Sequence, residues 1–213
     1  MSKIDFKLYL ITDRCQADGS SLKETVRAAL QGGVRVVQLR EKDLSDEELF
    51  RVAFDLRTLT REFGSRLLIN ARTDVCREVG ADGVHLGKFG ISIAEARHEL
   101  GKSCIIGYSA HSVSEALTAE KAGADFVTFG PVFHTPSKAA YGDPLGLAAL
   151  REACLTLGIP VFALGGVKLE NIANVMAAGA NGVALISAII AAQDPRAEAL
   201  SLLKTINSHD AFL

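Results

Sequence analysis

The sequence predicts an α/β protein in which eight parallel strands alternate with helices, forming a single (β/α)8 barrel over residues 1–213. Three observations predict this fold. Short apolar runs recur along the chain, segments with helical spacing lie between them, and glycines end several of those segments just before the next run. A doubly wound sheet is the alternative, but eight similar units and the lack of GxGxxG after the first run favour the barrel.

The apolar runs are the expected strands. Each is rich in branched side chains and is mostly apolar on both faces, as a strand covered on both sides should be. The runs are LYLIT (8–12), VRVVQL (34–39), RLLIN (66–70), DGVHL (82–86), CIIGYS (104–109), DFVTFG (125–130), PVFAL (160–164) and GVALIS (182–187).

The helix boundaries are marked by serine and glycine. Four helices are expected to begin with a Ser-x-x-Glu capping box, in which serine and glutamate accept each other's backbone N–H. The serines are Ser21, Ser45, Ser92 and Ser112. Glycine marks the helix ends in GGV (32–34), GADGV (80–84), GADFV (123–127) and GANGV (179–183). The stretch VFHTPSKAAYGDPLG (132–146) lengthens one unit and predicts a functional loop.

Composition excludes several classes of function. A net charge of −2 gives no electrostatic case for nucleic acid or an anionic membrane as partner. No apolar run has the length of a membrane span, and the start MSKIDFKLYLITD lacks a signal-peptide layout. Cys15, Cys76, Cys104 and Cys154 form no CxxC pair, so we expect reduced thiols in a cytoplasmic protein.

Polar residues gather where the strands end, which is where barrel sites form. The candidates are Gln38, Arg40, Lys42, Asn70, Ser109, His111, Thr135, Ser137 and Lys138. Because several are cationic in a slightly acidic protein, they predict a small ligand with anionic groups. The alternative for REKD (40–43) is a solvated charge run with internal salt bridges.

Two further strand ends predict a phosphate site. Gly165 and Gly166 follow the seventh run, and Ile186 and Ser187 follow the eighth. Backbone N–H groups at a helix start there would bind phosphate, with Gly166, Ile186 and Ser187 as the expected contacts. The alternative is that the glycines only form a tight turn.

His111 follows the fifth run and precedes the serine cap of the next helix. A neutral imidazole there could take and return a proton near neutral pH, or it could fill a turn. Position alone leaves both open. The sequence contains no HxH or HExxH, so no histidine zinc site is expected.

At these residues the chain resembles thiamin phosphate synthase and its TenI-type relatives. The resemblance spans almost the whole chain. It rests on YLITD, GGVRVVQLREK, LLINAR, GADGVHLG, IGYSAHS, FGPVFHTPSK, ALGGV and GVALISAI. It implies a TIM barrel working in thiamin biosynthesis. It implies pyrimidine diphosphate contacts at Gln38, Leu39, Arg40, Glu41, Lys42, Asn70, Ser109 and Lys138, and thiazole phosphate contacts at Thr135, Pro136, Ser137, Gly166, Ile186 and Ser187.

The chain departs from the synthase pattern at two positions. The resemblance implies aspartate ligands for Mg²⁺ where this sequence has Ala71 and Gly90. Mg²⁺ prefers carboxylate and phosphate oxygens, and neither residue has a side-chain oxygen to offer. The sequence therefore predicts a TenI-type thiazole tautomerase that aromatises a thiazole carboxylate phosphate, with His111 as general acid–base and with no cofactor or metal.

Two alternatives remain at this point. One is a thiamin phosphate synthase that joins a pyrimidine diphosphate to the thiazole phosphate and uses Mg²⁺. The other is a non-enzymatic binder of thiamin or thiazole phosphate. The sequence leaves the oligomeric state open, with a homodimer through the outer helices as one candidate.

Overall fold

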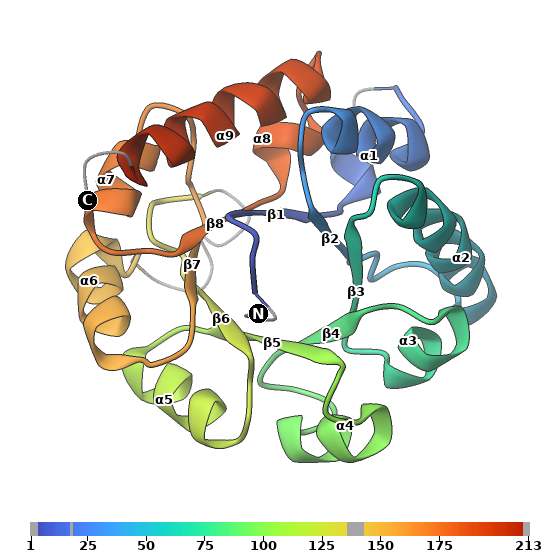
Figure 1. Ribbon diagram of the computed structural model, residues 1–213, viewed down its shortest axis with the longest axis horizontal. Helices are drawn as coiled ribbons and strands as arrows, with labels where there is room; N and C mark the ends of the chain where they lie inside the picture. Colours follow the sequence, from blue (N-terminus) through green and yellow to red (C-terminus); the bar gives the residue numbers. More distant parts are fainter. Residues whose placement is uncertain (1–3, 18, 136–142, 211–213) are drawn as a thin grey trace.

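The computed structural model describes residues 4–17, 19–135 and 143–210. Its strands form a closed parallel barrel in which each strand pairs with the next and β8 pairs with β1. Figure 1 shows this ring of strands with the helices arranged around its outside. The strands are β1 (Leu8–Ile11), β2 (Val36–Leu39), β3 (Arg66–Asn70), β4 (Gly83–Leu86), β5 (Ile105–Ala110), β6 (Phe126–Phe129), β7 (Val161–Leu164) and β8 (Gly182–Leu185). The predicted (β/α)8 barrel is confirmed.

Helices connect the strands and cover their outer faces. They are α1 (Leu22–Gln31), α2 (Asp46–Glu62), α3 (Thr73–Val79), α4 (Ile93–Leu100), α5 (Val113–Lys121), α6 (Gly146–Thr156), α7 (Ile172–Ala177), α8 (Ser187–Ile190) and α9 (Pro195–Asp210), with a short 3-10 turn η1 (Arg14–Gln16) after β1. None of the helices in the described ranges is long and apolar enough to cross a membrane.

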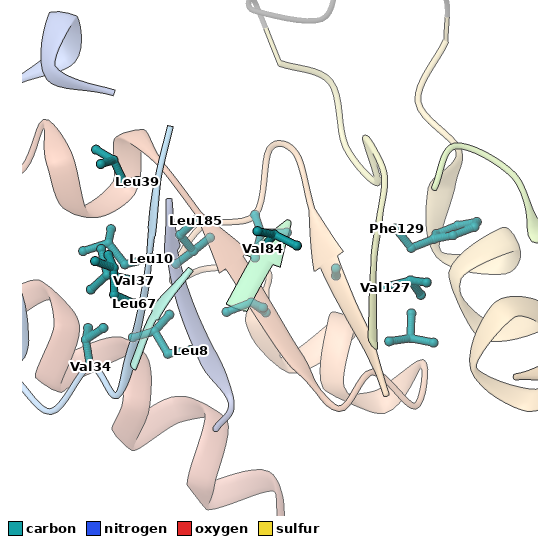
Figure 2. Close-up of a cluster of buried hydrophobic side chains, with 14 of the residues drawn as sticks. Leu8, Leu10, Val34, Val37, Leu39, Leu67, Val84, Val127, Phe129 and Leu185 are labelled. Atoms are coloured by element: carbon teal, nitrogen blue, oxygen red, sulfur yellow. The ribbon is translucent and has the colours of Figure 1, made fainter. Parts of the chain in front are cut away.

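Alternation along each strand separates two sets of buried side chains. Leu185, Leu10, Val37 and Leu67 are register neighbours on four adjacent strands, and they belong to the large cluster between strands and helices. Figure 2 shows residues of this outer layer. The residues of opposite parity fill the barrel interior in a second, smaller cluster. The strands are therefore buried on both faces, as their continuous apolar character predicts.

Aromatic rings close the end of the barrel where the strands begin. Phe6 precedes β1, and its ring lies 5.2 Å from that of Phe162 and 5.8 Å from that of Phe126, measured between centroids. The N-terminal segment accordingly lies inside the ring of strands in Figure 1. These rings fill the interior at this end, and the polar side chains of the interior lie toward the other end.

Three of the four expected capping boxes form completely, at Ser21, Ser45 and Ser92. At Ser112 only half of the box forms. Its hydroxyl accepts from the Glu115 N–H, but the Glu115 carboxylate accepts from the His111 N–H instead, at 2.8 Å. The φ of Ser112 is −157°, against −66° at Ser21, so the N–H of Ser112 points elsewhere.

The repeated Gly-Ala-Asp/Asn pattern has a structural role. Asp82 accepts from the N–H of Leu67 at the start of β3, and Asp125 accepts from that of Ile106 in β5, each at 2.8 Å. Asn181 accepts from the first N–H of β7 in the same way. The glycine before each of these three residues has a positive φ, as expected where a helix ends in the left-handed region. The pattern therefore ends a helix and binds the strand before it.

Cys15, Cys76, Cys104 and Cys154 are free thiols. Cys76 and Cys104 are buried with their Sγ atoms 4.0 Å apart.

Candidate functional site

A cluster of buried polar side chains lies in the barrel interior toward the ends of the strands. Gln38 Nε2 donates to the Tyr9 hydroxyl at 2.8 Å, and that hydroxyl lies 3.2 Å from Nδ1 of His85. His85 Nε2 lies 2.9 Å from Ser109 Oγ. The Thr128 hydroxyl lies 3.4 Å from both His85 Nε2 and Ser109 Oγ. Five strands thus contribute to one hydrogen-bonded network.

Gly107 makes room for this network. It is the register neighbour of His85 on β5. A Cβ at position 107 would lie 2.5 Å from His85 Nδ1 and would overlap the Phe126 ring. A side chain at this position would therefore displace the imidazole, so the glycine is required by close approach.

His85 is neutral in this environment. Burial and, to a smaller extent, the positive charge of Arg40 lower the pKa of His85 to about 3. Burial also raises the pKa of Tyr9, so its phenol keeps its proton. The network is therefore uncharged at neutral pH, and the Arg40 guanidinium is close enough for its charge to act on His85.

Two groups at the mouth of the barrel keep unused hydrogen-bond donors, and a third hydroxyl lies with them. The Arg40 guanidinium and the Asn70 amide have no acceptor among the residues that the structure describes. The Ser109 hydroxyl contacts His85 Nε2, and the direction of its proton depends on the tautomer of that imidazole. The backbone N–H of Arg40 is held by the Thr12 hydroxyl at 2.9 Å. All three side chains are partly exposed. Arg40 follows β2, Asn70 is the last residue of β3, and Ser109 lies near the end of β5. An anion entering the mouth would meet these donors.

The carboxylates near the mouth are bound by two other arginines. Arg14 binds Asp43 through both carboxylate oxygens, at 2.6 and 2.8 Å, and also contacts Glu41. Arg14 lowers the pKa of Asp43 in this way. The REKD run therefore forms no closed set of internal salt bridges, because its acidic members pair with a residue after β1.

Arg72 binds the remaining pair. It contacts Asp46 at 2.5 Å and Asp74 at 2.7 Å, and it lowers the pKa of Asp74 to about 2. Both carboxylates belong to first turns of helices, α2 and α3. They hold Arg72 in place and are themselves neutralised by it.

The residues present do not fit a magnesium ion at positions 71 and 90. Ala71 and Gly90 supply no oxygen, and the nearby carboxylates are engaged by Arg14 and Arg72. Within residues 4–17, 19–135 and 143–210 there is no group of three or more His, Cys, Asp or Glu that could hold a metal. Ala71 has φ +57°, in the left-handed region that aspartate tolerates, whereas Gly90 has φ +104°, which strains any side chain.

The expected phosphate-binding residues lie at the same end of the barrel. Gly165 and Gly166 follow β7 with positive φ, and Ile186 precedes α8, which begins at Ser187. A Cβ on Gly165 would lie 2.6 Å from Pro131, and one on Gly166 would lie 2.7 Å from Phe133. The glycines thus allow the segment after β6 to pack against the end of β7. This is a structural role, as in the alternative interpretation in which the glycines form a tight turn.

The other predicted residues vary in how far the structure places them. Thr135 is partly buried after β6, and Lys42 is exposed after β2. Ser137 and Lys138, with Pro136, lie outside the described residues. Gln38 is buried and bound to Tyr9, so it belongs to the interior network and does not open onto the mouth.

His111 is not part of the interior network. Its side chain is exposed, and Nδ1 lies 2.6 Å from the Gly130 carbonyl, to which Nδ1–H donates. The histidine in contact with Ser109 is His85, which sequence reasoning placed in a strand without a role. The sequence DGVHL could have indicated this position, because neighbouring side chains of a strand point to opposite faces. Val84 packs outward against the helices, so His85 must point into the barrel.

Residues 8–189 match the family model described as Thiamine monophosphate synthase. A Geobacter sulfurreducens protein named "Putative thiamine-phosphate synthase" is 57% identical over 203 residues, covering 95% of each chain. Thiamine-phosphate synthase of Clostridium novyi is 44% identical, covering 90% of this chain and 94% of the relative. The solved thiamine phosphate pyrophosphorylase from Pyrococcus furiosus has TM-score 0.87 at 38% identity, covering 95% and 96% of the two chains.

These relatives overturn the prediction of a thiazole tautomerase. That prediction gave the missing aspartates at positions 71 and 90 more weight than the retained residues around the mouth. Relatives with 40–57% identity over at least nine tenths of this chain carry the synthase name. The role of His111 as general acid–base was tied to the tautomerase reaction and loses its basis with it. The chain belongs to the thiamine monophosphate synthase family.

Proposed function

We propose that this protein is a thiamine-phosphate synthase that joins a pyrimidine diphosphate to a thiazole phosphate and releases diphosphate. The observation that carries the proposal is the set of unused donors on Arg40 and Asn70 at one mouth, with the Ser109 hydroxyl at the same end of the barrel. Such donors suit an oxygen-rich anion. The names of the relatives support the same reaction.

The reaction needs stabilisation of a leaving anion and no proton transfer. The bond between the pyrimidine methylene carbon and the diphosphate oxygen breaks, and its electron pair leaves with diphosphate. The thiazole nitrogen then donates its lone pair to the methylene carbon, which forms the new C–N bond. Donors fixed in advance around the departing oxygens lower the barrier, because negative charge grows there in the transition state.

Each substrate has an expected place in this scheme. The diphosphate contacts Arg40, Lys42 and Ser109, with Lys138 as a further cation outside the described residues. Asn70 orients the pyrimidine diphosphate. Gln38 acts on this substrate only indirectly, through its hydrogen bond to Tyr9. The thiazole phosphate binds the N–H groups around Gly166, Ile186 and Ser187, since the first N–H groups of a helix lack partners within it. Thr135 borders that phosphate, and Ser137, outside the described residues, is a further expected contact.

No step of this proposal passes through a metal ion, because the residues at positions 71 and 90 do not fit one. The charge on the leaving diphosphate is balanced by cationic side chains. Arg40 is the strongest candidate for this role, since its guanidinium can bind two oxygens at once.

The test is a condensation assay with both substrates and the purified protein. We expect thiamine phosphate and inorganic diphosphate to form in equal amounts. Arg40→Gln should lower kcat/KM roughly a hundredfold, as loss of a transition-state donor does. The matched control is Arg35→Gln, which removes an exposed arginine at the start of the same strand, and it should keep full activity. Binding of both substrates without turnover would refute the proposal and leave a non-enzymatic binder.

A further inference from the structure

We propose that His85 is a positioning residue whose fixed tautomer forces the Ser109 hydroxyl to donate its proton toward an anionic oxygen of the substrate at the barrel mouth. The inference rests on the proposed function for the identity of that substrate. It follows from counting donors and acceptors along the chain of contacts from Gln38 to Ser109.

The hydrogen bonds of Gln38 and Tyr9 determine the tautomer of His85. Gln38 Nε2–H donates to the Tyr9 oxygen at 2.8 Å, so the Tyr9 proton must go elsewhere. Its other partner is Nδ1 of His85, at 3.2 Å. The burial of both rings keeps the phenol protonated and the imidazole neutral, as their pKa shifts indicate. Nδ1 is therefore the acceptor, and the single imidazole proton lies on Nε2.

The direction of the next hydrogen bond follows. Nε2–H of His85 donates to Ser109 Oγ at 2.9 Å, and the Thr128 hydroxyl donates to the same oxygen at 3.4 Å. A hydroxyl has two acceptor lone pairs and one proton. Both lone pairs of Ser109 are thus used, and only its O–H is left to meet a ligand.

The consequence is a selective contact. Ser109 can donate to a ligand but cannot accept from one, so a phosphate oxygen suits it and an N–H or O–H does not. The Arg40 guanidinium acts on the same region, since its charge influences His85. The two donors together favour a diphosphate oxygen over a neutral group.

The tautomer can be measured directly in the folded protein. In ¹⁵N NMR of histidine-labelled protein at pH 7, assigned with His85→Gln, we expect an Nε2-protonated and Nδ1-unprotonated imidazole at position 85. Protonation at Nδ1 would overturn the proposal, because Ser109 would then have to donate to Nε2. This result does not depend on any activity.

The effect on ligand binding can be measured with inorganic diphosphate by calorimetry. Ser109→Ala should weaken its binding roughly tenfold or more, as loss of a hydrogen bond to a charged acceptor does. Tyr9→Phe removes the donor that fixes His85 and should weaken binding similarly. Because both changes remove the same hydrogen bond, Ser109→Ala should add little in the Tyr9→Phe background.

Two further variants separate positioning from packing. His85→Gln keeps an acceptor for Tyr9 and a donor for Ser109, so its affinity should stay within roughly threefold of wild type, whereas His85→Leu should bind as weakly as Ser109→Ala. Ser103→Ala, an exposed serine near the start of β5, should bind normally. Additive losses in the double variant, or equal affinities of the Gln and Leu variants, would refute the positioning role.

The outcomes also separate this inference from the proposed function. Diphosphate binding with the expected pattern but without condensation would leave the inference standing and remove the synthase assignment. Condensation with an unchanged diphosphate affinity in Ser109→Ala and Tyr9→Phe would do the reverse.

Discussion

Mild acid should destabilise this protein through His85. The imidazole is buried and neutral, with a pKa lowered to about 3, whereas in the unfolded chain it titrates near the ordinary value of about 6.5. Between these two pH values the unfolded state binds a proton that the folded state does not. The free energy of unfolding therefore falls as pH decreases from 6.5, and it continues to fall until the folded-state pKa is reached.

The size of the effect follows from the two pKa values. Each pH unit within this window costs about 1.4 kcal/mol, so pH 5 should lower the free energy of unfolding by about 2 kcal/mol relative to pH 7. The full loss, near pH 3, is about 5 kcal/mol. The carboxylates with a lowered pKa, among them Asp74 at about 2 and the three capping-box glutamates, add their own losses mainly below pH 5, so the interval from pH 7 to pH 5 reports chiefly on the histidine.

The assay is chemical denaturation at pH 7 and pH 5. His85→Gln removes the titrating group and keeps the hydrogen-bond pattern, so the variant should lose about 2 kcal/mol less than wild type over this range. His98→Gln changes an exposed histidine on α4 and should follow wild type. Equal losses in wild type and His85→Gln would show that the buried imidazole is not excluded from protonation, and the reasoning would fail.

Three other changes test the barrel and the mouth. Gly107→Ala inserts a methyl group against Phe126 and should lower the free energy of unfolding by about 1–3 kcal/mol, whereas Gly87→Ala, with no atom within 4 Å, should cost far less in the same denaturation experiment. Asp125→Ala removes the acceptor of a β5 amide and of an arginine, and should cost about 1–3 kcal/mol on the same measurement. Ala71→Asp restores a carboxylate where the backbone accepts it, so calorimetry with inorganic diphosphate present should show Mg²⁺ binding at least about tenfold tighter than wild type; unchanged binding would place no ion there.

The helices, strands and their order were predictable because their signals are local. Branched apolar runs, Ser-x-x-Glu starts and Gly-Ala-Asp ends each act within a few residues. Each expected strand corresponds to a strand of the structure, and the predicted and observed ends differ by at most two residues. The half-formed capping box at Ser112 is the exception, because the extended backbone that β5 imposes there turned the serine N–H away from Glu115.

The contacts of the site were less predictable because they join residues far apart in the chain. Arg14 forms ion pairs with the carboxylates of Glu41 and Asp43. The local REKD pattern gives no indication of a partner that follows β1. His111 lies in a motif that stands out in sequence, yet its ring binds a carbonyl at the rim. His85 looks like one residue of a buried strand, yet it connects Tyr9 to Ser109.

The barrel, its order of strands and the end at which polar groups gather follow from local patterns, because period and capping are properties of neighbouring residues. Which of those polar groups are engaged and which remain available depends on contacts between distant parts of the folded chain. Closing eight strands into a ring brings Gln38, Tyr9, His85 and Ser109 within hydrogen-bond distance although up to 100 residues separate them. The direction of each hydrogen bond then depends on burial, since the dry interior keeps the imidazole neutral well below its ordinary pKa, beside a protonated phenol.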